Sequence, residues 1–320
     1  MKRIRSLLLA LMLLAFLLAG CGGVSTAPAV TDAPAEAPTE PQPEATDAIP
    51  AETPTETPVV GVASGADVIA YDAVEEDGMV PIGPEHIKDG VYDVEMKSSS
   101  SMFRADHCSL TVSGSEMYAT LYMTSDAFLY MFAGTAVEAA SSDKDDYILL
   151  EPSNQDGCMQ FVLPLNALDH GESFAAFSRK KELWYDRTLL FKSTSLPIDA
   201  FEDGFIATAN NLGLADGDYS IEVALYGGSG KSTISTPAKI TVTNGECVAE
   251  IVWSSSKYDY VRIGEDMYLP VNTDGNSVFL IPILYFDYSM EIWADTTAMS
   301  QPHEIAYTLR FDSSTIHPVG

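Results

Sequence analysis

The octapeptide "DGVYDVEM" at residues 89–96 returns as "DGDYSIEV" at residues 216–223, with its Asp-Gly turn, its Tyr and its apolar-polar alternation preserved. Two further pairs of segments match in the same order along the chain. They are "SLTVSGSEMYATLYMTS" at 109–125 with "KITVTNGECVAEIVWSS" at 239–255, and "FVLPLNALD" at 161–169 with "FLIPILYFD" at 279–287. Matches that keep their order over this length indicate an internal duplication.

Each copy consists of short segments rich in Val, Ile, Tyr, Phe and Thr, in which apolar and polar residues alternate. Turn dipeptides such as Asn244-Gly245 separate them. Roughly seven or eight such segments in about 110 residues are typical of an antiparallel β-sandwich. The sequence therefore predicts an all-β chain with two tandem immunoglobulin-like antiparallel β-sandwich domains, at 87–198 and 214–316. A linker at 199–213 joins them, and residues 61–86 form an N-terminal extension.

The N-terminus has the features of a secretory signal peptide over residues 1–20. Lys2, Arg3 and Arg5 precede an apolar run that is short for a membrane span and ends in small residues. The tetrapeptide Leu18-Ala19-Gly20-Cys21 resembles the lipobox of bacterial lipoproteins. That resemblance implies a lipid-modified Cys21 that anchors the protein on the extracellular face of the cell membrane, whereas the alternative is a plain secreted protein.

Residues 21–60 are predicted to be a disordered tether. The segment 22–58 holds eight prolines and seven acidic residues among Ala and Thr, with no Lys, Arg or aromatic residue. Such a composition buries too little apolar surface to offset the entropy of ordering. We therefore expect the tether to carry the two domains away from the membrane.

The chain is strongly acidic, with 17 Lys and Arg against 46 Asp and Glu and a net charge of −29 at pH 7. Nucleic acids and anionic lipid surfaces need basic charge on their partner, so the sequence disfavours both as ligands. The alternative interpretation is that the acidity only keeps an extracellular protein soluble.

The cysteines and histidines show no catalytic or metal-binding pattern. Cys108, Cys158 and Cys247 match no Cys-x-x-Cys spacing, and either one Cys108–Cys158 disulfide or three free thiols are compatible with the sequence. The five His residues are not spaced as ligands on one strand or helix. We therefore expect a binding protein without a catalytic residue or a dedicated metal site, rather than an enzyme.

The closing hairpin of each copy carries residues that could bind a ligand or a metal ion. "KELWYDRTLLF" at 181–191 and "HEIAYTLRF" at 303–311 each hold a Tyr, Tyr185 or Tyr307, four residues after Lys181 or His303. Positions four apart in a strand point to the same face, and phenolate and imidazole are both iron ligands. The plainer interpretation is that these rings pack in the core.

Basic charge is concentrated around the first of these hairpins. The basic patch consists of Arg179, Lys180, Lys181 and Arg187, with Lys192 close by in sequence. In so acidic a chain, this cluster is suited to attract an anionic ligand or partner. Alternatively, these residues pair with carboxylates on neighbouring strands.

The order of segments resembles the NEAT (near-iron transporter) family of Gram-positive surface domains. The shared features are an Asp-Gly-x-Tyr strand, a Ser-rich loop, a strand such as "PAKITVTNG" at 237–245 and a final hairpin with a Tyr, over 87–195 and 214–315. The resemblance implies an immunoglobulin-like sandwich that binds haem between the first loop and the last hairpin, with a Tyr as iron ligand. Where that family has Tyr-x-x-x-Tyr, this chain has Lys-x-x-x-Tyr and His-x-x-x-Tyr.

Carried over by position, the resemblance gives a set of candidate haem contacts. The first copy supplies Tyr185, Lys181 and the "SSSSMFR" loop residues Ser101, Met102 and Phe103, and the second supplies Tyr307, His303 and Met299. We therefore expect a membrane-anchored extracellular lipoprotein that binds a small ligand, haem or iron, for uptake. The alternative is a non-catalytic adhesion or scaffold module that binds a protein or glycan through the basic patch and Trp184.

Overall fold

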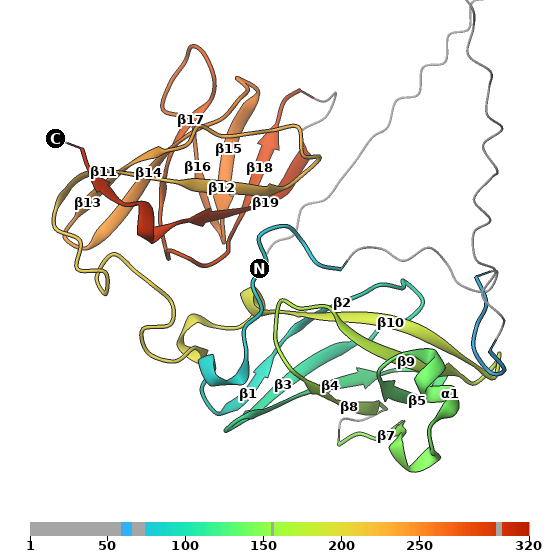
Figure 1. Ribbon diagram of the computed structural model, residues 1–320. Coiled ribbons are helices and arrows are strands. Elements are labelled where there is room, and N and C mark those ends of the chain that lie inside the picture. Colours follow the sequence, from blue (N-terminus) through green and yellow to red (C-terminus); the bar gives the residue numbers. More distant parts are fainter. Residues whose placement is uncertain (1–58, 66–73, 155–156, 299–302, 320) are drawn as a thin grey trace, which may run out of the picture. The chain divides into compact units, whose positions relative to one another are not determined.

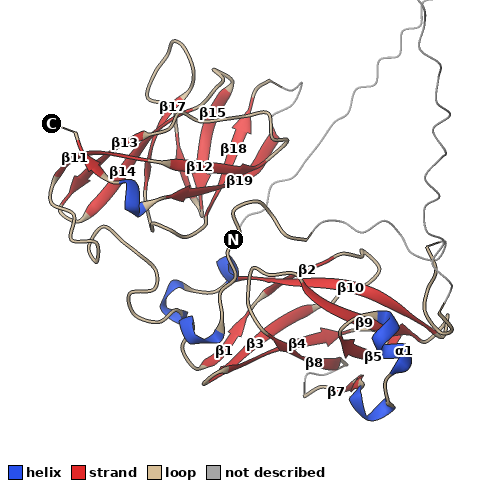
Figure 2. Cartoon of the chain, in the orientation of Figure 1, coloured by secondary structure: helices blue, strands red, loops and turns tan. Residues whose placement is uncertain are grey.

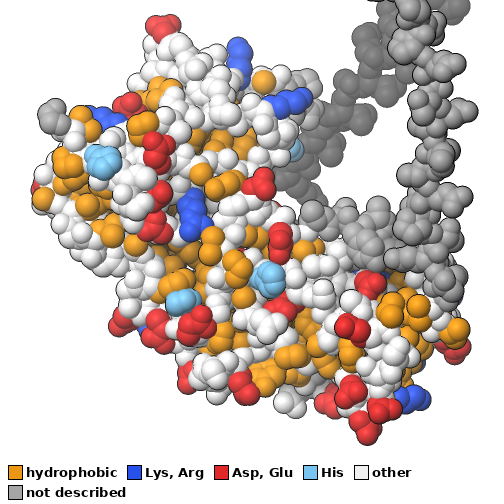
Figure 3. Space-filling view, viewed as in Figure 1, with side chains coloured by type: hydrophobic (Ala, Val, Ile, Leu, Met, Phe, Trp, Pro, Cys, Tyr) orange, Lys and Arg blue, Asp and Glu red, His pale blue; other side chains and the backbone are white. Residues whose placement is uncertain are grey.

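The computed structural model describes residues 59–65, 74–154, 157–298 and 303–319. The predicted signal peptide, the predicted lipidation site Cys21, most of the predicted tether and Met299 lie outside these ranges. Among the residues described, no helix has the length and apolarity that a membrane span requires. Acidic side chains are spread over the face shown in Figure 3, where Lys and Arg are few, as the net charge of −29 leads one to expect.

The first copy is a sandwich of two five-stranded antiparallel sheets (Figures 1 and 2). One sheet has the order β1-β3-β4-β8-β7 and the other β2-β10-β9-β5-β6. The strands are β1 (Gly90–Asp93), β2 (Glu95–Ser98), β3 (His107–Ser113), β4 (Glu116–Met123), β5 (Phe128–Ala133), β6 (Ile148–Leu149), β7 (Glu151–Pro152), β8 (Met159–Leu165), β9 (Glu172–Ser178) and β10 (Leu183–Lys192).

The second copy has the same construction, with sheets β17-β14-β13-β11-β20 and β12-β19-β18-β15-β16. Its strands are β11 (Gly217–Ile221), β12 (Val223–Gly227), β13 (Ala238–Thr243), β14 (Glu246–Val252), β15 (Tyr258–Ile263), β16 (Asp266–Tyr268), β17 (Val278–Pro282), β18 (Met290–Thr296), β19 (His303–Phe311) and β20 (His317–Pro318). The predicted all-β fold of two sandwich domains is confirmed.

Helical structure within the described residues is limited to short pieces. One α-helix, α1 (Ala136–Ser141), begins at a capping box in which Thr135 and Glu138 satisfy each other's backbone N–H groups. Single-turn 3₁₀ helices occupy the connections at Pro84–His86, Lys144–Asp146, Ser193–Ser195, Ile198–Ala200 and Ser313–Thr315.

Equivalent hydrogen bonds confirm that the two copies are one repeated unit. The Tyr92 hydroxyl donates to the carbonyl of Lys88 at 2.8 Å, and the Tyr219 hydroxyl donates to that of Ala215 at the same distance. These bonds brace the first strand of each copy. In the same way, Asp89 and Asp216 each accept a backbone N–H of the β3–β4 or β13–β14 turn at 2.7 Å.

The cores of the two copies are built from matching positions. Leu110, Phe161 and Phe191 in the first copy, and Ile240, Phe279 and Phe311 in the second, all have 0 % exposed surface. In strands such as β4 and β13, buried residues alternate with more exposed ones, so that one face of each sheet enters the core.

The three cysteines described are all free thiols, so the alternative of a Cys108–Cys158 disulfide is wrong. Cys108 and Cys247 are buried in the two cores, and burial raises the pKa of Cys108 to about 12 and that of Cys247 to about 11. Both thiols therefore behave as small apolar side chains.

The outer face of the first copy's β5-β9-β10 region is covered rather than open. Helix α1 lies against it, and Ala136 and Ala139 of the helix pack on Trp184, which is 3 % exposed. The Asp186 carboxylate on β10 accepts the N–H of Ala136 at 2.6 Å and holds the start of the helix in place. The prediction that Trp184 belongs to a surface contact patch is therefore wrong.

Candidate ligand cavity of the first sandwich

The register of the closing strands corrects the pairing of the two tyrosines. Phe191 pairs with Met96 in β2, and Phe311 pairs with Val223 at the equivalent position of β12. Counting back from these anchors places Tyr307 on the position of Arg187, not on that of Tyr185. The sequence comparison aligns the two stretches on their shared Glu, aliphatic residue and Tyr. The hairpin turns that precede them differ in length, so this alignment does not follow the strand register.

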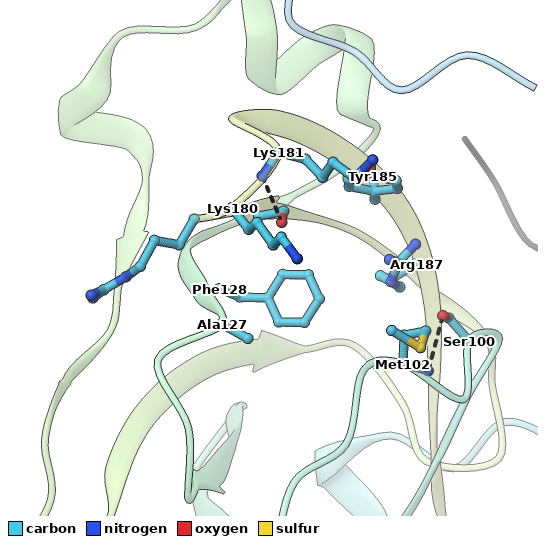
Figure 4. A pocket seen from close by; sticks show the side chains of 10 residues that line it. Ser100, Met102, Ala127, Phe128, Lys180, Lys181, Tyr185 and Arg187 are labelled. Carbon is cyan, nitrogen blue, oxygen red and sulfur yellow. Dashed lines mark hydrogen bonds between the residues drawn. The ribbon is translucent and has the colours of Figure 1, made fainter. Parts of the chain in front are cut away.

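The first copy contains a cavity of about 520 Å³ beside Tyr185. Its wall is formed by the β9–β10 hairpin, the start of β5 and the loop after β2 (Figure 4). The lining residues are Ser100, Met102, Ala127, Phe128, Ser178, Arg179, Lys180, Lys181, Tyr185 and Arg187. Pockets of about 300–1,000 Å³ commonly hold small ligands and cofactors.

An aromatic and guanidinium stack forms the inner wall. The Arg187 guanidinium lies 5.1 Å from the centre of the Tyr185 ring and 5.9 Å from that of Phe128. Its Nη1 donates to the carbonyl of Asp186 at 2.6 Å, and the residue is 6 % exposed. Arg187 thus lines the same cavity as Arg179, Lys180 and Lys181, with which it was predicted to form a basic patch, but it is held in the inner wall against two rings.

Tyr185 itself lies where its ring can meet a ligand. It is 9 % exposed and lines the cavity together with Lys181, which lies in the turn before β10 and not on the strand itself. The Tyr185 hydroxyl forms no hydrogen bond within the described part of the chain. A phenol with that freedom can donate to a ligand or, as phenolate, coordinate a metal ion.

The rim of the cavity is cationic. Arg179 is paired with Asp126 at 2.7 Å, with both side chains more than half exposed. Lys180 and Lys181 have no carboxylate within 4.0 Å of their ammonium groups among the residues described. The two lysines therefore remain available to an anionic ligand. Arg179 instead pairs with a carboxylate on a neighbouring segment, which was the alternative stated for the basic patch.

The loop after β2 contributes fewer residues than predicted. Met102 is 67 % exposed and lines the cavity, with its backbone N–H donating to the Ser100 hydroxyl at 3.3 Å. Phe103 is 1 % exposed and packs on Phe128 in the core, with ring centres 5.1 Å apart, so its predicted place at the lip is wrong. Ser100 lines the cavity in place of Ser101.

The equivalent region of the second copy is closed by its own side chains. Tyr307 is 4 % exposed, and its hydroxyl lies 3.0 Å from that of Tyr258, which lies 2.6 Å from that of Ser232. The Trp253 ring packs on Tyr307 with centres 5.2 Å apart. Burial raises the pKa of Tyr258 to about 12. The prediction of Tyr307 as a ligand is therefore contradicted by its burial and hydrogen bonding.

The remaining predicted residues of the second copy do not form a site. His303 is exposed at the start of β19, and Met299 lies outside the described residues. No group of three or more His, Cys, Asp or Glu among the residues described could hold a metal ion.

Sequence reasoning missed several residues of the cavity. Ala127, Phe128, Ser178 and Ser100 carry no motif of their own. Phe128 reaches the cavity because it starts β5, where it pairs with Ser178 at the end of β9. That pairing follows only from the sheet order.

Comparison with known proteins assigns no relative. No family model matches the chain, and no curated protein matches it.

Proposed function

We propose that this chain is a membrane-anchored extracellular lipoprotein whose first sandwich binds an iron-bearing small ligand, haem, for uptake. The observation that carries the proposal is a cavity of about 520 Å³ lined by Tyr185, Lys180 and Lys181, in which neither lysine pairs with a carboxylate of the described residues. The lipid anchor at Cys21 remains a prediction from the sequence.

The residues present suit a flat, amphiphilic anion. Phe128, the Tyr185 ring and Met102 offer apolar surface, and Lys180 and Lys181 offer positive charge at the opening. When bound, haem would supply the iron and a planar apolar ring. Tyr185 would hold the iron through its phenol oxygen, and the two lysines would face the carboxylates of the ligand.

Arg187 supports the role proposed for Tyr185. Its guanidinium lies 5.1 Å from the centre of the Tyr185 ring and helps to hold that ring in the cavity wall. Its own position is fixed by the Asp186 carbonyl.

The experiment is a hemin titration of the purified full-length chain, followed by absorbance in the Soret region. We expect a shifted Soret band that Tyr185→Phe abolishes or strongly weakens, and that the matched variant Tyr307→Phe leaves in place. A spectrum without any shift, or one that Tyr185→Phe leaves unchanged, would contradict the proposal.

The alternative of an adhesion or scaffold module is less well supported. Trp184, one of its proposed contacts, is buried under α1, and Arg187 is buried in the cavity wall. Arg179, Lys180 and Lys181 remain exposed and could still attract an acidic partner. Binding that is salt-sensitive and lost on charge reversal of these three, without hemin binding, would favour this alternative.

A further inference from the structure

The outer face of the second copy's β15-β18-β19 region differs from its counterpart in the first copy. In both copies the strands pair in the same register: Phe132 lies opposite Ala175, and Arg262 lies opposite Trp293. The neighbouring pairs, Tyr130 with Phe177 and Tyr260 with Asp295, correspond in the same way. Figure 1 shows β15, β18 and β19 side by side in the second copy.

In the first copy this face is apolar and covered. Its positions are held by Tyr130, Phe132, Ala175, Phe177 and Trp184, which pack together beneath Ala136 and Ala139 of α1. In the second copy, Gly264 and Glu265 alone join β15 to β16, so there is no helix at this connection. The equivalent face is therefore left without that cover.

The side chains on the uncovered face are polar and aromatic. They are Tyr260, Arg262, Trp293, Asp295 and Glu304. Trp293 is 38 % exposed, whereas the other two tryptophans, Trp184 and Trp253, are 3 % and 0 % exposed. A large exposed indole on a sheet is a recognition feature when fixed polar groups surround it.

Arg262 and Glu304 form the fixed polar part. Arg262 donates through Nε and Nη2 to the two oxygens of the Glu304 carboxylate, at 2.9 Å and 2.7 Å, and through Nη1 to the carbonyl of Gly264 at 2.8 Å. The Tyr260 hydroxyl donates to the same carboxylate at 3.0 Å. The guanidinium also lies 5.5 Å from the centre of the Trp293 ring. This bidentate network orients the indole and its neighbours before any ligand arrives.

Asp295 is the second, independent observation. It is 2 % exposed, and its Oδ2 has no hydrogen-bond partner among the described residues. Desolvation and the neighbouring Asp259 carboxyl raise its pKa. A buried carboxyl oxygen without a partner is costly and uncommon, so it points to a group that completes its hydrogen bonding.

We propose that this face of the second sandwich binds a pyranoside glycan, with a sugar ring stacked on Trp293 and its hydroxyls bonded to Asp295, Glu304 and Arg262. A sugar ring combines an apolar face with hydroxyls that both donate and accept. The protein face offers the same combination, because Arg262 uses three of its five N–H groups on protein partners and the carboxyl groups supply acceptors.

A cationic ligand fits the face less well. Arg262 already occupies a cation position over the Trp293 ring, and it neutralises Glu304 through two hydrogen bonds. A positively charged group that approached the indole would meet the guanidinium. A neutral polyhydroxylated ring meets no such repulsion.

The test is binding of chitohexaose and cellohexaose to the purified full-length chain, measured by tryptophan fluorescence and by protection from acrylamide quenching. Because Trp293 is the exposed indole, we expect binding of at least one oligosaccharide to change its emission and shield it. Trp293→Ala should abolish binding, and Asp295→Asn should weaken it about tenfold, the size of one lost hydrogen bond to a charged group.

Trp184→Phe is the matched control, because that indole is covered by α1 and should leave oligosaccharide binding unchanged. Hemin binding by the first copy should persist in Trp293→Ala. Failure of both oligosaccharides to bind at millimolar concentration, equal binding by Trp293→Ala, or binding of a lysine-rich peptide in place of either sugar would each overturn the proposal.

Discussion

The two sandwiches share sheet order, register and core positions, but they differ on both faces of one sheet. On the inner face, the first copy keeps a cavity between Phe128, Tyr185 and Arg187, and the second fills the equivalent region with Tyr258 and Tyr307. On the outer face, the first copy is covered by α1 and the second is open around Trp293. The comparison shows that the shared core residues maintain the same fold in both copies, while the residues on the two faces of one sheet differ between the copies.

The shared core should respond equally in the two copies. Phe191→Ala and Phe311→Ala each remove a fully buried ring at equivalent positions, and each should reduce the free energy of unfolding by about 3–5 kcal/mol. The matched surface variants Val162→Ala and Leu280→Ala, at 42 % and 45 % exposure, should each change it by about 0.5 kcal/mol or less. Urea unfolding checks this. A large loss at one Phe and a negligible loss at the other would show that the cores are not equivalent.

The loop that closes the second copy should be sensitive at one glycine. Gly228 has φ +62°, and a Cβ there would lie 2.5 Å from the Tyr307 ring. Gly228→Ala should therefore lower stability by about 1–3 kcal/mol more than Gly230→Ala, which shares the left-handed conformation but meets nothing within 4 Å. Thermal unfolding of the two variants measures the difference. Equal losses would mean that the loop does not pack on Tyr307 in solution.

Removing one hydroxyl should separate stability from binding. Tyr307→Phe breaks the hydrogen bond to Tyr258 and should cost about 0.5–1.5 kcal/mol without affecting hemin. Tyr185→Phe loses no hydrogen bond to a described residue, so it should change stability by about 0.5 kcal/mol or less and still eliminate the ligand oxygen. Urea unfolding and hemin titration of both variants test this, and a reversed pattern would refute the assignment of roles.

Ionisation of Tyr258 should weaken the second copy at alkaline pH. Tyr258 occupies the position of Phe128, and burial raises its pKa to about 12 from an ordinary value of 10. Above pH 10 the unfolded chain loses this proton first, so the folded state binds more protons and stability falls between pH 10 and about 12. Tyr258→Phe should make this fall shallower in a series of urea titrations. An equally steep fall in the variant would exclude Tyr258 as its cause.

The sequence was sufficient for the fold because strand alternation and Asp-Gly turns are local signals. It was also sufficient for Lys181, Tyr185 and Met102, which all line the cavity. It failed for Tyr307, because the two stretches were matched on residue type, and the hairpin turns before them differ in length, so residues of the same type do not occupy equivalent strand positions.

Other failures have a tertiary cause. The sequence alone does not show whether Trp184 and Phe103 lie on the surface or in the core. Trp184 is buried because α1 packs on it, and Phe103 is buried because it packs on Phe128. Similarly, nothing local in the sequence distinguishes Trp293 from Trp184. Trp184 is buried because α1 and Val62 of the N-terminal extension pack on it, whereas Trp293 has no such helix beside it in the described part of the chain and is 38 % exposed.

The most direct test of the difference between the copies is the number of hemin equivalents that one full-length chain binds. An open cavity in the first copy and a closed one in the second predict saturation at one equivalent, with that equivalent lost in Tyr185→Phe and retained in Tyr307→Phe. Saturation at two equivalents, or a single equivalent that depends on Tyr307 instead, would contradict the account.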